Sequence, residues 1–250
     1  MQNERSSGRG CGRGPLARSH EHGRETLFFA GDLGQRIFQQ PFSWASLGVE
    51  VRGRSLTLKV NYRTSHQIRE KADRLLPGIL AGVDGRQEQR EGTVSVFNGP
   101  VPVVQMFDSA DEELQAVGEV IKWAVAEGIK PDEIGVFVRT RAALPRARSA
   151  VAAAGLEAAE ITPRKEGPIS AVRVGIMHLA KGLEFKAVLV VACDEELLPL
   201  KERIETVADE VELDDVFSTE RQLLYVACTR ARDRLVLTGI KPGSEFLRDL

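Results

Sequence analysis

The chain has 250 residues, of which 42% are hydrophobic and 28% are charged, as is ordinary for a globular protein with a sizeable core. Lysine and arginine total 34 against 36 aspartate and glutamate, so the net charge of -2 identifies no nucleic-acid binder, and any basic surface must be local. No apolar run approaches the roughly 20 residues of a membrane span. The first residues also lack the apolar core of a secretory signal. The three cysteines form no CxxC pair, which argues against a zinc ribbon or a disulfide framework and favours the cytoplasm.

Residues 1–26 are rich in glycine, arginine and serine and almost free of apolar side chains. Such a segment cannot bury enough surface to offset its ordering entropy, so we expect a disordered tail. Its alternating glycines lack the preceding strand and following helix that a dinucleotide fingerprint requires. Arg-Gly tracts can bind nucleic acid weakly, but a solvated leader without a function is the alternative that we favour.

From Leu27 onward, apolar runs typical of strands are interspersed with segments of helical spacing. The predicted strands are 27–32, 54–60, 93–97, 101–107, 134–140, 171–178, 187–193 and 234–239. The predicted helices are 61–76, 109–127, 141–155 and 219–232. Strands alternating with helices predict an α/β fold with a parallel or mostly parallel sheet and helices on both faces.

Two stretches interrupt this pattern. Residues 82–92 read as a polar loop, and Asn98-Gly99-Pro100 reads as a turn that joins the strands on either side of it. Between Asp194 and Glu220, eleven acidic residues are opposed only by Lys201 and Arg203. This imbalance predicts a long, exposed connection with a solvated run of charge.

Two clusters near the start of the ordered pattern contain side chains that are suited to binding or catalysis. In Gly31–Phe38 (GDLGQRIF), a strand end with Asp and a neutral amide suits a loop that senses a phosphate or a water, although an ordinary turn explains it equally. In NYRTS, Tyr62 can stack on a base and Arg63 can reach a phosphate. The alternative is that Thr64 or Ser65 caps the following helix.

Two further clusters lie in the second half of the chain. In HLAKGLEF, Gly182 allows close backbone approach and Glu184 can accept a hydrogen bond from a ribose hydroxyl, or the segment is a tight turn with surface charges. In ERQLLYVACTR, the apolar face explains Leu223 and Val226 as core residues but does not explain Arg230. A buried arginine needs an anion, either a ligand or an internal salt bridge.

In this order the four clusters resemble the third to sixth motifs of superfamily 1 DNA helicases of the UvrD/Rep type. The resemblance extends from Leu27 to about Gly239. It implies an ATP-dependent DNA helicase with two RecA-like lobes, with ATP in the cleft between them and single-stranded DNA across both. The expected fold is then a RecA-like, mostly parallel sheet flanked by helices, similar to a P-loop NTPase.

The resemblance assigns three residues to the reacting phosphate, Gln35, Arg63 and Arg230. Gln35 would contact the γ-phosphate or the attacking water, and the two arginines would be the arginine fingers of the cleft. The chemistry suits these residue types, because phosphoryl transfer spreads negative charge over the transferred group and guanidinium forks stabilise that charge. Fingers carried by the second lobe act only when the lobes close, so hydrolysis can be coupled to movement along DNA.

By the same resemblance, Tyr62 would stack on adenine, and Glu184 would bind the ribose beside Gly182. His178 would lie near the DNA and link it to the nucleotide site. Trp44 would stack on a base or pack against the first lobe. The family commonly carries a threonine two residues before this histidine, where the chain has Ile176, and this departure puts one phosphate contact in doubt.

The P-loop signature needs a Gly-Lys pair, and no glycine of these 250 residues is followed by lysine. ATP with Mg²⁺ is therefore expected only where a P-loop lobe is supplied. The sequence VLVVACDEE ends in three carboxylates at 194–196, but it follows KGLEF, so we interpret it as a structural strand and loop. The expected domains are the tail 1–26, a remnant of the first lobe at 27–50 and the second RecA-like lobe at 51–250.

The leading hypothesis is the C-terminal domain of a DNA helicase, inactive alone, with weak binding to single-stranded DNA and a P-loop lobe or subunit as partner. One alternative is a non-enzymatic, nucleic-acid-binding accessory protein that donates Arg63 and Arg230 in trans. A vestigial fragment is another alternative. An unrelated nucleotide-binding enzyme is disfavoured, because the glycine fingerprint is missing.

Overall fold

A computed structural model describes residues 35, 37, 58–77, 79–81, 87–89, 93–162 and 167–250, with the backbone alone at 79–81 and 87–89. The chain divides into two units, residues 1–33 and 34–250, and all described residues belong to the second. The predicted tail, the predicted strand at 27–32 and Trp44 lie outside the described residues, so those predictions stay open.

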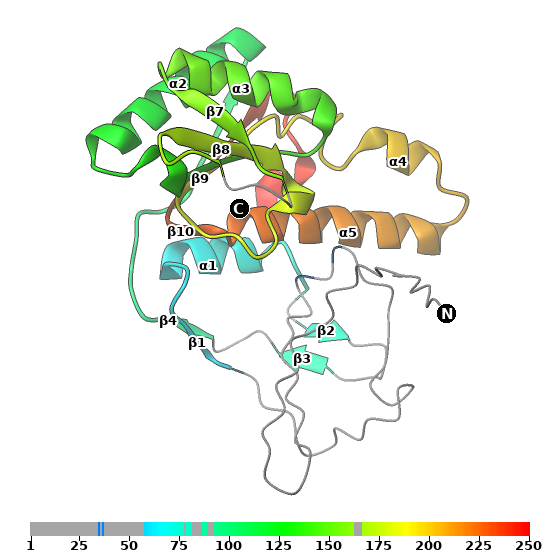
Figure 1. The fold of residues 1–250 in the computed structure, drawn as a ribbon. Coiled ribbons are helices and arrows are strands. Elements are labelled where there is room, and N and C mark those ends of the chain that lie inside the picture. The colour runs from blue at the N-terminus through cyan, green and yellow to red at the C-terminus, as the bar shows by residue number, and fades with distance from the viewer. Residues whose placement is uncertain are drawn as a thin grey trace, which may run out of the picture. The chain divides into compact units, whose positions relative to one another are not determined.

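The core of the second unit is a six-stranded sheet of order β5-β10-β9-β6-β8-β7 (Figure 1). Every neighbouring pair in it is parallel, which confirms the predicted α/β fold. The strands are β5 (Val103–Phe107), β6 (Ile134–Val138), β7 (Glu157–Glu160), β8 (Ala171–Ile176), β9 (Phe185–Val190) and β10 (Ala231–Ile240). Central strands β6 and β9 are almost wholly buried, as expected of strands covered on both faces.

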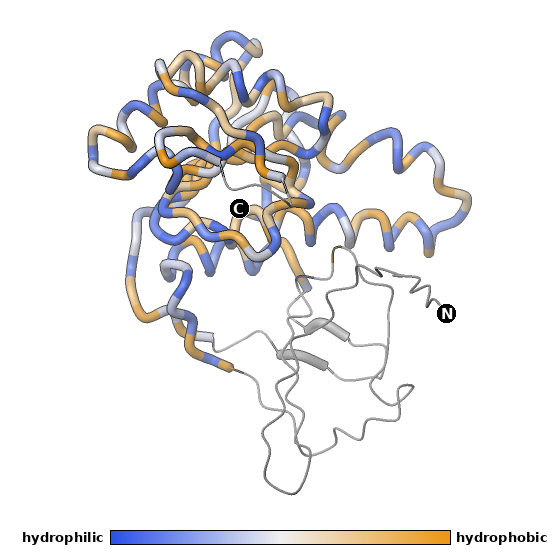
Figure 2. The backbone as a smooth tube through the Cα atoms, viewed as in Figure 1, coloured by the Kyte–Doolittle hydropathy of each residue, from blue (hydrophilic) through white to orange (hydrophobic). Residues whose placement is uncertain are grey.

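Helices cover both faces of the sheet, as predicted (Figure 1). On one face, α2 (Ala110–Ala126) and α3 (Leu144–Ala153) pack on the strands, and their apolar residues share one core cluster with β6, β8 and β9. On the other face lie α1 (His66–Asp73) and α5 (Glu210–Cys228). Figure 2 shows hydrophilic and hydrophobic positions alternating along these helices, as a helix with one buried face requires.

The ends of the predicted helices follow ordinary capping rules. Ser109 caps α2, and its hydroxyl accepts a hydrogen bond from the amide of Glu112 at 3.2 Å. Gly128 and Gly155 adopt φ values of +89° and +74° just after α2 and α3, the left-handed conformation in which glycine ends a helix. The start of α2 and the ends of α2 and α3 therefore lie where the sequence predicted them.

One prediction about the first part of the fold was wrong. The supposed polar loop contains β3 (Gln87–Gln89), which pairs antiparallel with β2 (Ile79–Ala81). Asn98-Gly99-Pro100 lies in the connection between β4 (Val94–Ser95) and β5. These two strands belong to different sheets, because β4 pairs with β1 (Val60–Asn61), whereas β5 joins the six-stranded sheet.

The predicted exposed connection at 194–220 is largely helical. It contains α4 (Lys201–Glu205), and α5 begins at Glu210, well before the predicted start at 219. Asp209 caps α5 by accepting a hydrogen bond from the amide of Glu212 at 2.8 Å. Acidic residues suit this position, since the first turn of a helix carries partial positive charge. The charge run therefore initiates a helix, and its last member, Glu220, is fully buried.

Two further observations concern the described residues alone. None of their helices combines the length and the apolarity that crossing a bilayer would require. The described cysteines, Cys193 and Cys228, are free and buried, and burial raises the pKa of Cys228 to about 12. That thiol is therefore protonated at neutral pH and is a poor nucleophile.

Candidate nucleotide-binding site

Two connections run from the carboxyl edge of the sheet, where its parallel strands end, to the amino edge, where they begin. The first is residues 177–184, which leave β8 and enter β9 on the far side of β6. The second is the later part of α5, which leads through Thr229 and Arg230 into β10. Both connections lie on the α1 side of the sheet, where α5 packs on the 3₁₀ turn Met177–Leu179 (Figure 1). Each connection therefore brings one group of residues to the carboxyl edge of the sheet and another group to the amino edge.

At the amino edge, the short loop Lys181–Glu184 collects contacts from three of the predicted site residues. The Arg63 Nε donates to Glu184 Oε2 at 2.9 Å. The Arg230 Nη1 donates to the carbonyl oxygen of Leu183 at 3.4 Å. The Nζ of Lys181 donates to the carbonyl oxygen of Gln35 at 2.9 Å. Residues far apart in the sequence thus meet at one loop.

The backbone around Arg63 is held in place by local and long-range hydrogen bonds. The Asn61 side-chain oxygen accepts from the amides of Arg63 and Thr64, at 2.8 and 3.3 Å. The Ser65 amide donates to the carbonyl oxygen of Arg232 at 3.0 Å, which ties this turn to β10. Ser65 is the N-cap residue of α1, as the alternative interpretation of NYRTS expected, although its hydroxyl makes no capping hydrogen bond.

Arg230 is buried, with 1% of its surface exposed. Besides the bond to Leu183, its Nε donates to the Val226 carbonyl oxygen at 3.0 Å and its Nη2 to the Thr229 hydroxyl at 3.2 Å. These bonds fix the plane of the guanidinium against the loop. By contrast, the side chains of Arg63 and Glu184 are 45% and 47% exposed, so their ion pair borders solvent.

The remaining predicted nucleotide contacts lie on the same stretches of backbone. Tyr62 is 73% exposed, so its ring is available to a planar ligand. Gly182 has a φ of +87°, a conformation that side chains disfavour, and a Cβ atom added there would meet no atom within 4 Å. The backbone conformation therefore explains why residue 182 is a glycine. The space beside Gly182 is open in this structure.

His178 lies at the opposite, carboxyl edge, in the 3₁₀ turn after β8. Burial lowers its pKa, and the charge of Arg139 lowers it further, while Glu220 acts in the opposite direction. The imidazole is thus neutral at pH 7. The structure therefore separates His178 from the cluster of Arg63, Glu184 and Arg230 by the length of the 177–184 connection.

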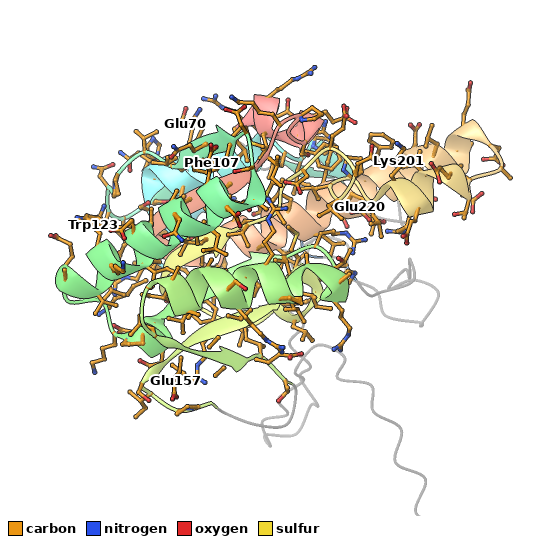
Figure 3. All side chains as sticks on the ribbon, turned by 90° about the horizontal axis from the view of Figure 1, so that it is seen from above. Glu70, Phe107, Trp123, Glu157, Lys201 and Glu220 are labelled. Atoms are coloured by element: carbon orange, nitrogen blue, oxygen red, sulfur yellow. The ribbon has the colours of Figure 1, made fainter. Side chains whose placement is uncertain are left out.

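A buried ion cluster that the sequence did not predict lies beside His178. Arg139, directly after β6, donates two hydrogen bonds of 2.5 Å to the carboxylate of Glu220. Arg203 of α4 donates a third at 2.8 Å. The side chains of Glu220 and Arg139 are 0% and 6% exposed (Figure 3, where Glu220 is labelled on α5). An arginine that directly follows a buried apolar strand was the one available sequence signal for this cluster.

This cluster makes stability depend on pH. Burial alone would raise the pKa of Glu220, but its bonds to Arg139 and Arg203 outweigh burial and lower the pKa below 4.5. Below that pH the unfolded chain takes up a proton that the folded chain does not, so the free energy of unfolding falls as the pH falls. We expect Glu220→Gln to flatten this dependence below pH 4.5 in urea unfolding series. An unchanged slope would contradict the assignment.

A second cluster of ionic side chains, around the buried Glu113 at the carboxyl edge, shows which partners Asp194 has. Glu113 of α2 accepts from the Ala192 amide at 3.1 Å, from the Thr238 hydroxyl at 2.7 Å and from Arg146. Arg146 also donates to both oxygens of Asp194, at 2.5 and 3.2 Å. The carboxylate of Asp194 thus belongs to a structural cluster, in agreement with the interpretation of 188–196 as a strand and loop.

No group of three or more histidine, cysteine or acidic side chains in the described part of the chain is arranged to hold a metal ion. The described residues therefore do not fit a Mg²⁺ site by themselves.

The all-parallel sheet, with helices on both faces and a cluster of arginines with a carboxylate at its amino edge, defines a RecA-like α/β domain. A solved structure supports this fold. The C-terminal domain of a possible DNA helicase from Lactobacillus plantarum WCFS1 has a TM-score of 0.51 and 22% identity, and the match covers 75% of this chain and 92% of that chain.

Residues 149–242 match the family model of the UvrD-like helicase C-terminal domain. The chain is 39% identical over 85 residues to the ATP-dependent DNA helicase UvrD1 of Mycobacterium leprae. It is also 35% identical over 81 residues to a probable DNA helicase II homolog of Mycoplasma pneumoniae. These alignments cover 30% and 32% of this chain and span 10% of the length of each relative.

The comparisons bear on the four motifs unequally. The matched range contains HLAKGLEF and ERQLLYVACTRAR, so the resemblance is confirmed there. GDLGQRIF and NYRTS precede the matched range. Their assignment rests on the sequence and, for Gln35 and Arg63, on the contacts with the Lys181–Glu184 loop.

Proposed function

We propose that this chain supplies one half of an interdomain ATP site in a UvrD-like DNA helicase, and that a separate lobe with a P-loop supplies the other half. One observation carries the proposal: Arg63 and Arg230, separated by most of the chain, both bond to residues 183–184. Two guanidinium groups beside one carboxylate suit a nucleotide, whose phosphates need cations and whose ribose needs a hydrogen-bond acceptor.

In this proposal the nucleotide replaces the ion pair between Arg63 and Glu184. The pair is half exposed, and exposed ion pairs contribute at most about 1 kcal/mol, so exchanging it for ligand contacts costs little. The phosphates then take Arg63, and a ribose hydroxyl donates to Glu184. Tyr62 stacks on the adenine, which its exposure permits.

Arg230 acts as the second cation. Because it is buried beneath the loop, we expect nucleotide binding and lobe closure to move residues 181–184 and expose its guanidinium. Gln35, joined to the loop through Lys181, is the candidate for contacting the γ-phosphate or the attacking water. Any Mg²⁺ that accompanies the nucleotide would be held by the phosphates and by the P-loop lobe, and not by the described residues of this chain, and it would neutralise phosphate charge.

The opposite edge of the sheet is the proposed nucleic-acid side. His178 lies there, in the 3₁₀ turn from which the 177–184 connection leads across the sheet to the loop that Arg230 contacts. We propose single-stranded DNA as its partner, with binding that is weak and falls as salt concentration rises. A cytoplasmic location would fit this role.

Complementation tests the function. We expect the purified 250-residue chain to show no ATP turnover, with or without single-stranded DNA, because it contains no Gly-Lys pair. Adding a purified P-loop lobe from a UvrD-like helicase should give turnover that DNA stimulates. Binding of the two pieces without turnover would contradict the proposal, as would turnover by the chain alone.

A further inference from the structure

We propose that Glu220 is a positioning residue that, through Arg139 and Arg203, holds the side chain of His178 in place at the carboxyl edge of the sheet. Neither the motif resemblance nor the proposed ATP site assigns a role to this cluster. The positioning itself is independent of the proposed function. Only its consequence, that DNA binding depends on Glu220, rests on that function.

Strand register brings the cluster to His178. β6 and β8 are adjacent and parallel, and Val138 is paired with Ile176. Arg139 and Met177 directly follow this pair of residues, at the ends of β6 and β8. Arg139 is therefore level with the residue that precedes His178. The turn that holds His178 packs directly on α5, the helix that carries Glu220. The half-buried histidine therefore lies next to the elements that carry Arg139 and Glu220.

The cluster has one more positive than negative charge. One fully buried carboxylate serves two arginines, and its two oxygens accept three hydrogen bonds of 2.5, 2.5 and 2.8 Å. Without Glu220, Arg139 would be an uncompensated buried cation beside the imidazole. Glu220 thus offsets one of the two positive charges near His178, and its hydrogen bonds hold the Arg139 side chain in place.

The same helix connects the two proposed sites. Glu220 lies ten residues before Arg230, and α5 is continuous between Glu210 and Cys228. The helix spans about 12 Å from Glu220 to its last residue, Cys228, two residues before Arg230, so a displacement of Glu220 at the carboxyl edge is expected to move the segment that carries Arg230 at the amino edge. The positions of His178 and Arg230 therefore both depend on α5.

The test measures the titration of His178 by NMR in the full chain, with its imidazole signal assigned from its loss in His178→Gln. Glu220→Gln removes the negative charge and should lower the pKa of His178 by at least about 0.5 unit, since Arg139 and Arg203 remain. Arg203→Gln removes a positive charge and should raise it. Arg203 is 39% exposed, so this variant keeps the test decisive if Glu220→Gln does not fold.

Glu113→Gln is the matched control. It alters another buried carboxylate, bonded to Arg146 at the same edge, and should leave the titration of His178 unchanged. If Glu220→Gln and Arg203→Gln both leave the titration unchanged, Glu220 is only structural and the proposal is overturned. Opposite shifts in the two variants support it.

Binding to a fluorescent, single-stranded oligothymidine separates this proposal from the proposed function. We expect Glu220→Gln to weaken binding about as much as His178→Ala does, at one low salt concentration for all variants. If the titration shifts as expected but neither variant changes DNA binding, positioning by Glu220 stands and the nucleic-acid role of His178 is wrong.

Discussion

Replacing Arg230 by alanine in the complemented pair of lobes is expected to lower kcat for ATP by roughly 10³-fold or more, the range measured for arginine fingers elsewhere. The physical reason is the charge that spreads over the transferred phosphoryl group, which a second guanidinium stabilises only in the transition state. We therefore expect the loss in kcat, with little change in KM. Steady-state turnover with saturating single-stranded DNA measures both.

Two further variants make this result interpretable. Arg230→Lys keeps the charge but loses the planar fork that bonds Val226, Leu183 and a phosphate in one geometry, so it should recover little activity. Arg148→Ala removes a half-exposed arginine of α3 that pairs with Glu160, and it should retain turnover. A folded Arg230→Ala variant with kcat within threefold of the unaltered pair would exclude Arg230 as a finger.

Glu113→Ala should give the largest loss of stability, about 3–5 kcal/mol of the free energy of unfolding. Glu113 is 1% exposed, and its removal leaves the buried amide of Ala192 and the hydroxyl of Thr238 without their acceptor. Burial alone would lower the pKa of Arg146, but the carboxylates of Asp194 and Glu113 outweigh it and raise the pKa, so the guanidinium stays charged and loses one partner. Urea unfolding of the purified chain measures the change.

The control for this prediction lies on the same helix. Glu119 pairs with Lys122 at 2.7 Å on the exposed side of α2, where an ion pair contributes at most a few tenths of a kcal/mol. Glu119→Ala should therefore cost less than about 0.5 kcal/mol. If Glu113→Ala costs no more than Glu119→Ala, the buried cluster does not stabilise the fold.

The sequence predicted the elements of the sheet because each strand and helix carries its own local signal. The apolar runs at 134–140 and 187–193 and the Ser109 cap depend on neighbours within a few residues, and they were confirmed. The predictions that failed concern the loops. Polar residues at 82–92 did not exclude a strand, since β3 lies there, and the acidic charges of 209–215 suit a helix start as well as a loop.

The sequence by itself determined that this chain folds as a parallel α/β domain with UvrD-like motifs, because periodicity and motif spacing are properties of the chain alone. Only the tertiary structure decided that Arg63, Glu184 and Arg230 meet at one loop and that Arg139, Glu220 and Arg203 form a buried cluster near His178. The reason is physical: long-range hydrogen bonds, such as the one between Arg63 and Glu184, which are 121 positions apart, follow from strand order and register. Those are set by the packing of the whole sheet and leave no local trace in the sequence.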